Sequence, residues 1–418
     1  RLVDARRASS RQALRSPAPP TRTNRACATP VGPVRSTKTT LAIESKRWSV
    51  GPGTSTNMLH AVARRSTATT ARRAASSSGP LKVGVVGAGA VGSYMGVRLA
   101  ELGHDVRFLV MGSKPTPASI ACKSWQGDAL LENPRVARAP ADLADAGEPL
   151  DWVLCGLKST ALEGGADEAF QNLLKPCVGP ETRVQLLMNG LGAEEACAAA
   201  LGGDPARVHG GLVYGGFGWA DGAASHAGVP TAVHGGSLTD DAAQLDAAAA
   251  LWRPVDGSAA PEGAVAYEAQ PCLRLAQWAK LAWNVPFNGC TVLAGGADVG
   301  KLWVDAEGKA TAVAIMREVI RAANADLEAH GAAPRLDEEA LVEKLSAITD
   351  KMAEASYIPS TTNDFLAGRR MEVGAIFEEP VRRATAHGVD VPRLETLAGL
   401  LRVANDHIAA AGSWRDVT

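Results

Sequence analysis

The sequence predicts an α/β domain built on a parallel sheet, followed by an all-helical C-terminal domain. Three observations support this prediction. A buried apolar run at residues 83–86 leads at once into a glycine-rich turn and a helical pattern. Further apolar runs at residues 151–157 and 185–188 are typical of buried parallel strands. From about Ala260 onward, long stretches rich in Ala, Leu, Glu and Arg favour helices, and 418 residues are enough for two domains.

The first 80 residues differ in composition from the rest of the chain. They carry fifteen Arg or Lys against only Asp4 and Glu44, although the net charge of the whole chain is −1. Because they are rich in Arg and Ser and show no core pattern, we expect a disordered leader or transit segment over residues 1–80. A nucleic-acid-binding tail is the alternative, and the lack of aromatic residues beyond Trp48 disfavours it.

The first methionine of the sequence is Met58. Residues 58–80 hold four arginines and no acid, and their arginine pairs fall on roughly one helical face. We hypothesise that translation begins at Met58 and that the preceding residues are a gene-model extension. The expected location is organellar, the mitochondrion being favoured over the plastid, with the cytoplasm as the alternative.

Composition also bears on other kinds of site. The seven cysteines include no C-x-x-C pair and the eight histidines show no ligand spacing, which argues for a reducing compartment and against a structural metal. No uninterrupted apolar run reaches the roughly 18 residues that a transmembrane helix needs. Neither a nucleic acid, a metal nor a membrane is therefore an expected partner.

The glycine-rich turn has the spacing of a dinucleotide-binding fingerprint. The first strand is followed at once by Gly87-Ala88-Gly89-Ala90-Val91-Gly92, and a second strand is expected at residues 106–110. In that setting Gly87 permits a tight turn, Gly89 lets the backbone approach a pyrophosphate, and Gly92 lets the helix pack on the strand. The helix N-terminus offers free N–H groups to phosphates. A ligand-free glycine turn is the alternative.

These features divide the chain into three parts. We expect the leader over residues 1–80, a Rossmann-like dinucleotide-binding domain over residues 81–258, and a helical domain over residues 259–418. Residues 207–236, which are short β-like segments punctuated by glycine, are expected to finish the first sheet.

The end of the second strand bears on the choice of dinucleotide. An NAD protein usually places Asp or Glu there on the ribose hydroxyls, but residues 109–114 read LVMGSK. Absence of a carboxylate removes repulsion against a 2′-phosphate, and Ser113 and Lys114 could bind one. NADP(H) is therefore the expected cofactor, although a solvated turn is an equal alternative for these two residues.

Lys158 and Asn189 follow the next two predicted strands. Because ligands of open parallel sheets lie beyond the carboxyl ends of the strands, both residues are placed where a cofactor would lie. Asn189-Gly190 is also the commonest kind of turn dipeptide, so a plain turn is the alternative for Asn189.

Three polar residues interrupt the apolar first helix of the second domain at intervals of four: Lys280, Asn284 and Asn288. At about 100° and 1.5 Å per residue they share one stripe, with Lys280 and Asn284 roughly 6 Å apart. Pro286 should kink the helix between the two asparagines. A solvated lysine and capping asparagines are the ordinary interpretation, but burial without partners costs about 1–3 kcal/mol per group. We therefore expect the stripe to face a substrate.

A second polar group lies further along at Ser360, Asp364 and Glu372. Taken singly, Ser360 is expected to cap a helix that begins at Pro359-Ser360, Asp364 to interact with the helix dipole, and Glu372 to be a surface carboxylate. Only their combination with the lysine stripe indicates a site.

These pieces, in this order, resemble the ketopantoate reductase (2-dehydropantoate 2-reductase) family over most of residues 81–401. The specific matches are the Lys-x-x-x-Asn-x-x-x-Asn element that starts at Lys280, and the Ser-x-x-x-Asp element with Glu372 eight residues later. The resemblance implies NADPH-dependent reduction of ketopantoate to pantoate, in pantothenate and coenzyme A biosynthesis, at a cleft between the two domains. One departure is Met111, where the family usually has an arginine.

The resemblance also implies roles for single residues. Lys280 looks like the catalytic acid, and Glu372 looks like the carboxylate that orients the substrate hydroxyl. The implied substrate-binding groups are Asn284, Asn288 and Ser360. The implied cofactor contacts, besides the glycine turn, are Lys158 and Asn189.

A lysine suits this chemistry because hydride arriving at a ketone carbon builds negative charge on the oxygen. A positioned ammonium can stabilise that charge and deliver the proton. For this the pKa of Lys280 should lie about two units below its ordinary value. The apolar neighbours Trp278, Leu281 and Trp283 could supply the necessary desolvation.

Two other functions stay open. One is another 2-keto or 3-hydroxy acid reductase of the same architecture. The other is a non-catalytic NADPH-binding sensor, which the presence of both Lys280 and Glu372 disfavours. The expected partner is a small-molecule 2-keto acid, and homodimerisation is left open.

Overall fold

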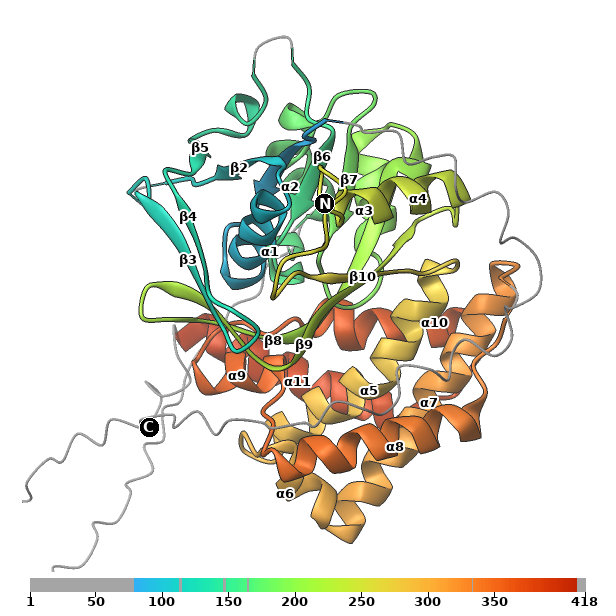
Figure 1. The fold of residues 1–418 in the computed structure, drawn as a ribbon. Coiled ribbons are helices and arrows are strands. Elements are labelled where there is room, and N and C mark those ends of the chain that lie inside the picture. The colour runs from blue at the N-terminus through green and yellow to red at the C-terminus, as the bar shows by residue number, and fades with distance from the viewer. Residues whose placement is uncertain (1–78, 113–114, 146–147, 164, 333, 412–418) are drawn as a thin grey trace, which may run out of the picture. The chain divides into compact units, whose positions relative to one another are not determined.

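The structure is a computed structural model that describes residues 79–112, 115–145, 148–163, 165–332 and 334–411. The predicted leader up to residue 78, the start proposed at Met58 and the pair Ser113 and Lys114 lie outside these ranges. The described residues form a large mixed sheet flanked by helices, followed by an extended set of helices (Figure 1). The predicted fold class is confirmed.

Six neighbouring strands of the sheet, β5, β2, β1, β6, β7 and β8, are parallel, as the sequence predicts for β1, β2, β6 and β7. β8 pairs parallel with β7, and β9 then returns antiparallel to β8. The order is β4-β3-β9-β8-β7-β6-β1-β2-β5, and β10 pairs with β9. The bounds are β1 Lys82–Val86, β2 Asp105–Leu109, β3 Ser119–Ser124, β4 Ala129–Glu132, β5 Arg135–Ala137, β6 Trp152–Cys155, β7 Arg183–Leu186, β8 Val208–Ala220, β9 Ala223–Ser237 and β10 Ala266–Ala269.

Alternate residues of the parallel strands point to opposite faces of the sheet, and both faces are buried. Val83 and Val85 pack in one apolar cluster with α1 and α4, whereas Val86 and Val153 pack in another with α2 and α3. Burial on both faces explains why these strands are almost continuously apolar. The helices are α1 Ala90–Glu101, α2 Ala166–Leu173, α3 Ala193–Leu201 and α4 Ala242–Leu251.

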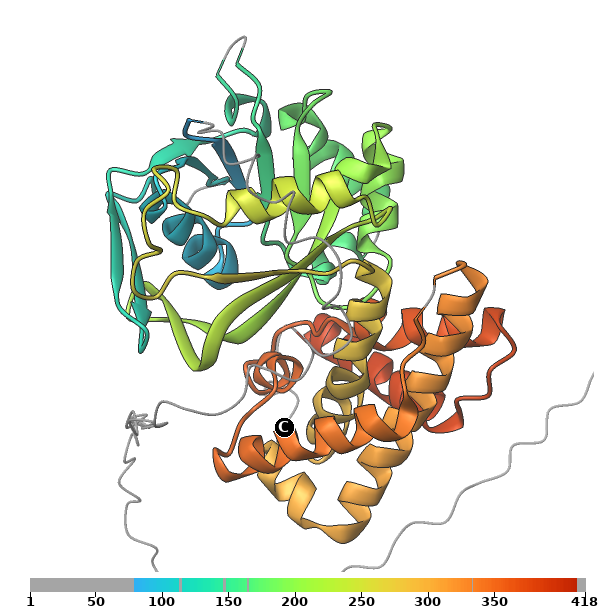
Figure 2. The same ribbon diagram turned by 45° about the vertical axis from the view of Figure 1, so that its right-hand side comes forward.

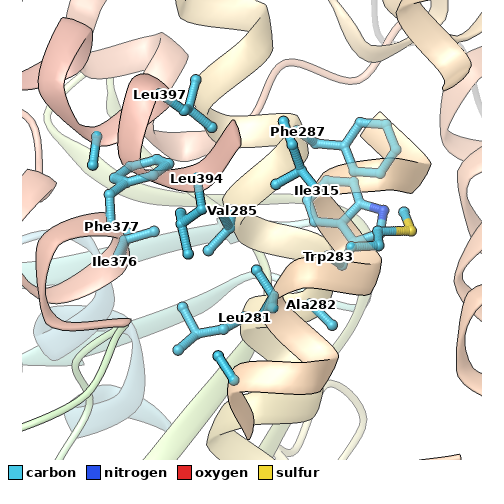
Figure 3. Packing of buried hydrophobic residues seen from close by; sticks show 14 of the residues in the cluster. Leu281, Ala282, Trp283, Val285, Phe287, Ile315, Ile376, Phe377, Leu394 and Leu397 are labelled. Carbon is cyan, nitrogen blue, oxygen red and sulfur yellow. The ribbon is translucent and has the colours of Figure 1, made fainter. Parts of the chain in front are cut away.

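The helical part is built around α5, which contacts α7, α9 and α11 and also reaches strands β8 and β9 (Figures 1 and 2). Leu281, Val285 and Phe287 of α5 lie in the main apolar cluster, with residues of the later helices around them (Figure 3). The bounds are α5 Leu273–Leu293, α6 Val299–Val304, α7 Ala306–Ala329, α8 Glu338–Glu354, α9 Ser360–Leu366, a π-helical turn Gly374–Glu378, α10 Glu379–Ala386 and α11 Pro392–Ala411.

Aspartates begin three of these helices. The carboxylates of Asp298, Asp305 and Asp337 accept hydrogen bonds from main-chain N–H groups in the first turns of α6, α7 and α8. Such caps satisfy N–H groups that have no partner within the helix, at about 1 kcal/mol each. They fix where the helices that support α5 begin.

The structure differs from the sequence prediction in one element. β10 lies in the stretch where helices were expected from about Ala260, and it pairs parallel with residues 232–235 of β9. The edge of β9 offers unpaired backbone groups, which a neighbouring segment can satisfy whatever its own helix propensity. Residues 207–236 do form strands of the sheet, as β8 and β9, but they do not finish it, because β3 and β10 both pair with β9.

Candidate active site

The glycine turn after β1 is as tightly packed as its predicted tasks require. Gly87 has a φ of +89°, and a Cβ there would lie 2.6 Å from the main-chain nitrogen of Leu157. A Cβ on Gly92 would lie 2.2 Å from the carbonyl oxygen of Gly87. At Gly89 a Cβ would meet no atom within 4 Å, so this part of the turn is open. The turn therefore combines close helix–strand packing with an approachable backbone.

The residues present fit a dinucleotide. α1 begins after Gly89 and has no acidic side chain in its first turn, so its free N–H groups and positive dipole end are uncompensated. Ala88, Ala90 and Val91 are small or apolar, and leave the backbone of the turn accessible to a phosphate. The predicted cofactor contacts in residues 87–92 thus lie together at the carboxyl end of β1.

Lys158 lies three residues after β6, at the start of a short 3₁₀ helix, Ser159–Leu162. Its Nζ donates to Asp364 of α9 at 2.7 Å. The carboxylate of Asp364 is 2% exposed and also accepts from Arg369, whereas the side chain of Lys158 is 51% exposed. Asp364 thus joins the sheet to α9 through Lys158, and is not the simple helix-dipole partner that its sequence position suggested.

Lys280 of α5 reaches across to the sheet. Its Nζ donates to Oδ1 of Asn189 at 2.9 Å and to the carbonyl oxygen of Val213 at 2.8 Å. The ring of Tyr214 lies 5.0 Å from the same nitrogen, within the range of a cation–π contact. Lys280, the expected catalytic acid, and Asn189, an expected cofactor contact, are therefore in direct hydrogen-bond contact, a pairing that the sequence did not predict.

Burial lowers the pKa of Lys280 to about 8, and the negative charge of Glu372 partly opposes this fall. Both the direction and the size agree with the prediction. The neighbours of Lys280 differ from those expected, because the groups that contact its Nζ belong to Asn189 and to β8. Trp278 and Trp283 instead donate their indole N–H groups to Asp326 of α7 and Thr349 of α8.

Glu372 is buried at 5% exposure, so the interpretation as a surface carboxylate is wrong. Its Oε1 accepts from the main-chain N–H of Ser159 at 2.9 Å and from the Ser159 hydroxyl at 3.2 Å. Its Oε2 lies 3.5 Å from Nδ2 of Asn189, which donates to it. Asn189 therefore lies between Lys280 and Glu372, accepting from the first and donating to the second.

The loop that carries Asn189 is held by the π-helical turn. The N–H of Leu191 donates to the carbonyl oxygen of Ala375 at 3.1 Å. In a π-turn that carbonyl would bond to the residue five positions on, but this is Pro380, which has no N–H. The Ala375 oxygen is thus available to the loop, and the backbone of Asn189-Gly190-Leu191 docks on the turn that follows Glu372.

Replacing Gly190 with alanine is expected to reduce both stability and turnover. Gly190 has a φ of +94°, and its Cβ would lie 2.4 Å from the Ala375 oxygen. The strain costs about 1–3 kcal/mol, and relief of the clash would move Asn189 away from Lys280. Calorimetry and steady-state kinetics measure both effects. Gly202→Ala is the matched control, because Gly202 also has a positive φ of +64° but open space around it. Equal turnover in the two variants would contradict this role of the loop.

The other predicted substrate-binding residues form no side-chain hydrogen bonds with the described part of the chain. Asn284 is half-buried and Asn288 is 2% exposed, and neither side chain hydrogen-bonds to any described residue. Both lie in the single helix α5, so a kink at Pro286 stays a prediction. Ser360 is exposed and is the first residue of α9, with Pro359 in the cap position, so the expected Ser360 cap is wrong.

A cavity of about 700 Å³ borders the Asn189 loop on the side of Leu191 and Gly192. Its lining includes Arg274, Arg383 and Asp326, which are joined by ion pairs. Lys280, Asn284 and Asn288 are not part of this lining. The cavity meets the candidate active site at Ser159, whose hydroxyl donates to Glu372.

The described ranges contain no candidate metal site, disulfide or membrane-spanning helix. These residues include no group of three or more side chains that could hold a metal ion. The six cysteines that they contain are free thiols, four of them buried. No helix among them is long and apolar enough to cross a bilayer.

Comparison with known proteins decides the family. The family model described as ketopantoate reductase PanE/ApbA matches residues 83–240, and the model of the C-terminal part of the same family matches residues 273–405. A solved 2-dehydropantoate 2-reductase from Geobacter metallireducens is 32% identical, with a TM-score of 0.67, and the match covers 78% of this chain and 100% of that one. The chain belongs to the ketopantoate reductase family.

Further relatives lie in the same family or share its fold. The 2-dehydropantoate 2-reductase of Nostoc sp. is 28% identical over 332 residues, which is 76% of this chain and 92% of the relative. A D-mandelate dehydrogenase solved with NADH and anilino(oxo)acetate has a TM-score of 0.64 at 17% identity, covering 79% of this chain and 100% of the other, and shows a common fold. The family is one of oxidoreductases.

Proposed function

We propose that this chain is an NADPH-dependent ketopantoate reductase, which forms pantoate for pantothenate and coenzyme A biosynthesis. One observation carries the proposal: a half-buried lysine with a pKa of about 8 is hydrogen-bonded to Asn189 at the sheet end that carries the glycine turn. Membership of the ketopantoate reductase family supports this choice of substrate.

The cofactor would supply a hydride to the carbonyl carbon of the 2-keto acid. Residues 87–92, Lys158 and Asn189 would hold it, and Ser113 and Lys114 are proposed to meet its 2′-phosphate. Lys280 would hold a proton on Nζ and release it to the developing alkoxide, which the ammonium also stabilises. Asn189 fixes the lysine, since its Oδ1 accepts one of the three ammonium hydrogens.

The substrate is proposed to lie along α5. Asn284, one turn after Lys280, and Ser360 of α9 have side chains free to bind its carboxylate or hydroxyl. Asn288 is proposed to meet the far end, where its buried amide would find a partner. Glu372 is proposed to orient the substrate hydroxyl with Oε2, while Oε1 stays on Ser159.

The rate of reduction is expected to depend on pH through Lys280. Because the ammonium form is the proton donor, kcat/KM for ketopantoate should be level below pH 8 and fall about tenfold per pH unit above it. His234, whose ring centroid lies 4.4 Å from that of Tyr214, does not add to this limb, because burial lowers its pKa and keeps it neutral there. A pH profile with no fall up to pH 10 would contradict the assignment.

One assay separates the possible substrates. NADPH oxidation by the full chain is followed with ketopantoate, and with a panel of other short 2-keto acids and 3-keto acids. Ketopantoate should give the highest kcat/KM. Turnover of another acid alone would favour a different reductase of the same architecture, and the D-mandelate dehydrogenase with the same fold makes aromatic 2-keto acids a useful part of the panel. Tight NADPH binding without any turnover would favour the sensor.

Location and assembly are separate proposals. The basic, acid-poor composition of residues 1–80 supports a mitochondrial leader. N-terminal sequencing of the mature protein tests this, because a leader predicts a start near Leu81 and the hypothesis of a start at Met58 predicts no residue before it. Homodimerisation can be tested by analytical ultracentrifugation.

A further inference from the structure

Arg138 lies beside the end of β2, directly after the neighbouring strand β5. β5 ends at Ala137, which pairs in parallel register with Leu109, the last residue of β2. The next residues stay together, because the N–H of Val110 donates to the Ala137 oxygen at 3.0 Å. The guanidinium of Arg138 then donates to the carbonyl oxygen of Gly112 at 2.6 Å. Arg138 therefore lies over the loop that follows β2, at the carboxyl edge of the sheet.

The charge of Arg138 is uncompensated within the described part of the chain. Its side chain is exposed, and no described carboxylate forms an ion pair with it. The other arginines of this region differ, since Arg107 and Arg135 both pair with Asp105 and Asp145. A guanidinium has five N–H donors, and the bond to Gly112 uses one of them. The rest are free for an anion.

Arg138 lies at the position where a sheet of this kind contacts the ribose of a bound dinucleotide. In a Rossmann-like domain, the end of the second strand meets the ribose 2′ position of the dinucleotide. A carboxylate there selects a 2′-hydroxyl, and an arginine nearby accommodates a 2′-phosphate. Val110, Met111 and Gly112 supply no charged side chain, but the guanidinium of Arg138, which follows β5, contacts Gly112.

We propose that Arg138 binds the 2′-phosphate of NADPH and is the residue that selects NADPH over NADH in this chain. The inference rests on the proposed dinucleotide-dependent function and deepens it. The forked guanidinium matches two phosphate oxygens, which a lysine cannot do with the same geometry. The bond to Gly112 holds the fork above the loop, so less side-chain entropy is lost when the phosphate binds. The assignment does not depend on Ser113 or Lys114.

Two nucleotide probes test the assignment without turnover. Binding of adenosine 2′,5′-bisphosphate and of 5′-AMP to the full chain is measured by calorimetry. The wild type should bind the bisphosphate more tightly. Arg138→Ala should weaken the bisphosphate about tenfold to a hundredfold and leave 5′-AMP within about twofold, since two charge-assisted hydrogen bonds are lost. Arg138→Lys should lie between the two.

A control variant separates this effect from a general loss of positive charge. Arg335 is also exposed, and it pairs with Glu328 on the helical part of the chain. Arg335→Ala should bind both probes as the wild type does. A second readout is the ratio of kcat/KM for NADPH to that for NADH, which Arg138→Ala should lower by the same factor as it weakens the bisphosphate.

The outcomes distinguish failure of the Arg138 assignment from failure of the proposed use of NADPH. A wild type that favours the bisphosphate, with Arg138→Ala favouring it equally, overturns the Arg138 assignment and leaves NADPH use intact. If Arg138→Ala weakens both probes equally, Arg138 merely fixes the loop at Gly112, and the assignment is again wrong. A wild type that binds both probes equally, or neither, overturns the choice of NADPH and the Arg138 assignment with it.

Discussion

Replacing Lys280 with methionine is expected to lower kcat for ketopantoate reduction about 10²–10⁴-fold, the usual contribution of a positioned general acid. Methionine keeps the length and apolar stem of the side chain but removes the ammonium that Asn189 and the Val213 carbonyl hold in place. Steady-state kinetics with saturating NADPH measure the loss. Because no cofactor contact is assigned to Lys280, binding of NADPH, followed by its fluorescence, should stay within about threefold of the wild type.

The control is Lys301→Met on α6, where the lysine side chain is 74% exposed. It should leave kcat unchanged and shows whether loss of one positive charge alone matters. Lys280→Met should also lack the fall in kcat/KM above pH 8. A Lys280→Met variant within fivefold of wild-type kcat would contradict the proposed role.

The second large effect is expected from Glu372→Gln. Glutamine cannot accept from both Ser159 and Asn189, and it places an NH₂ group against one of these donors. Loss of a buried acceptor costs about 1–3 kcal/mol, so both the thermal midpoint and kcat/KM should fall, the latter about tenfold to a hundredfold at pH 8. Because the charge of Glu372 raises the pKa of Lys280, its removal should also move the pH limb below 8.

If Glu372 had only a structural role, Glu372→Gln would lower stability but leave the pH at which kcat/KM falls unchanged. The matched control is Glu378→Gln, a change of the same type six residues later, where the carboxylate is 45% exposed and lies 3.6 Å from Arg402. That variant should keep both the rate and the pH profile. An unshifted limb in Glu372→Gln would contradict the coupling of the carboxylate to Lys280.

Local patterns made the glycine turn and the α5 stripe predictable. The tasks of Gly87 and Gly92 depend on atoms a few residues away and on the adjacent strand, so spacing alone indicates them. Lys280 and Asn284 follow from helix geometry. The low pKa of Lys280 was also predictable, because the sequence surrounds this lysine with apolar residues of its own helix, which favour loss of water.

Contacts between distant segments could not be read from the sequence. Ser159, Val213 and Tyr214 complete the site, although they lie more than sixty residues from Glu372 or Lys280. Tyr214 stands in a glycine-rich strand without clear periodicity, so nothing local marked it. Ser159 was missed beside Lys158, although a serine at a strand's carboxyl end was a usable signal.

The ion pair of Lys158 with Asp364 shows the same limit. The sequence predicts a separate role for each residue, and only the structure shows that they bind each other. The π-helical turn was equally hidden. Pro380 was visible in the sequence, but its effect on the Ala375 carbonyl depends on the fold bringing the N–H of Leu191 to that oxygen. Tertiary pairing, unlike helix periodicity, leaves no local trace.

The pKa of Lys280 itself gives the most direct test of a desolvated proton donor in this site. The full chain is labelled with [ε-¹³C]lysine, the Cε signal of Lys280 is assigned by its absence in Lys280→Met, and its chemical shift is followed from pH 6 to 11. We expect a midpoint near 8 for Lys280. A Lys280 midpoint above pH 10 would contradict a desolvated proton donor in this site.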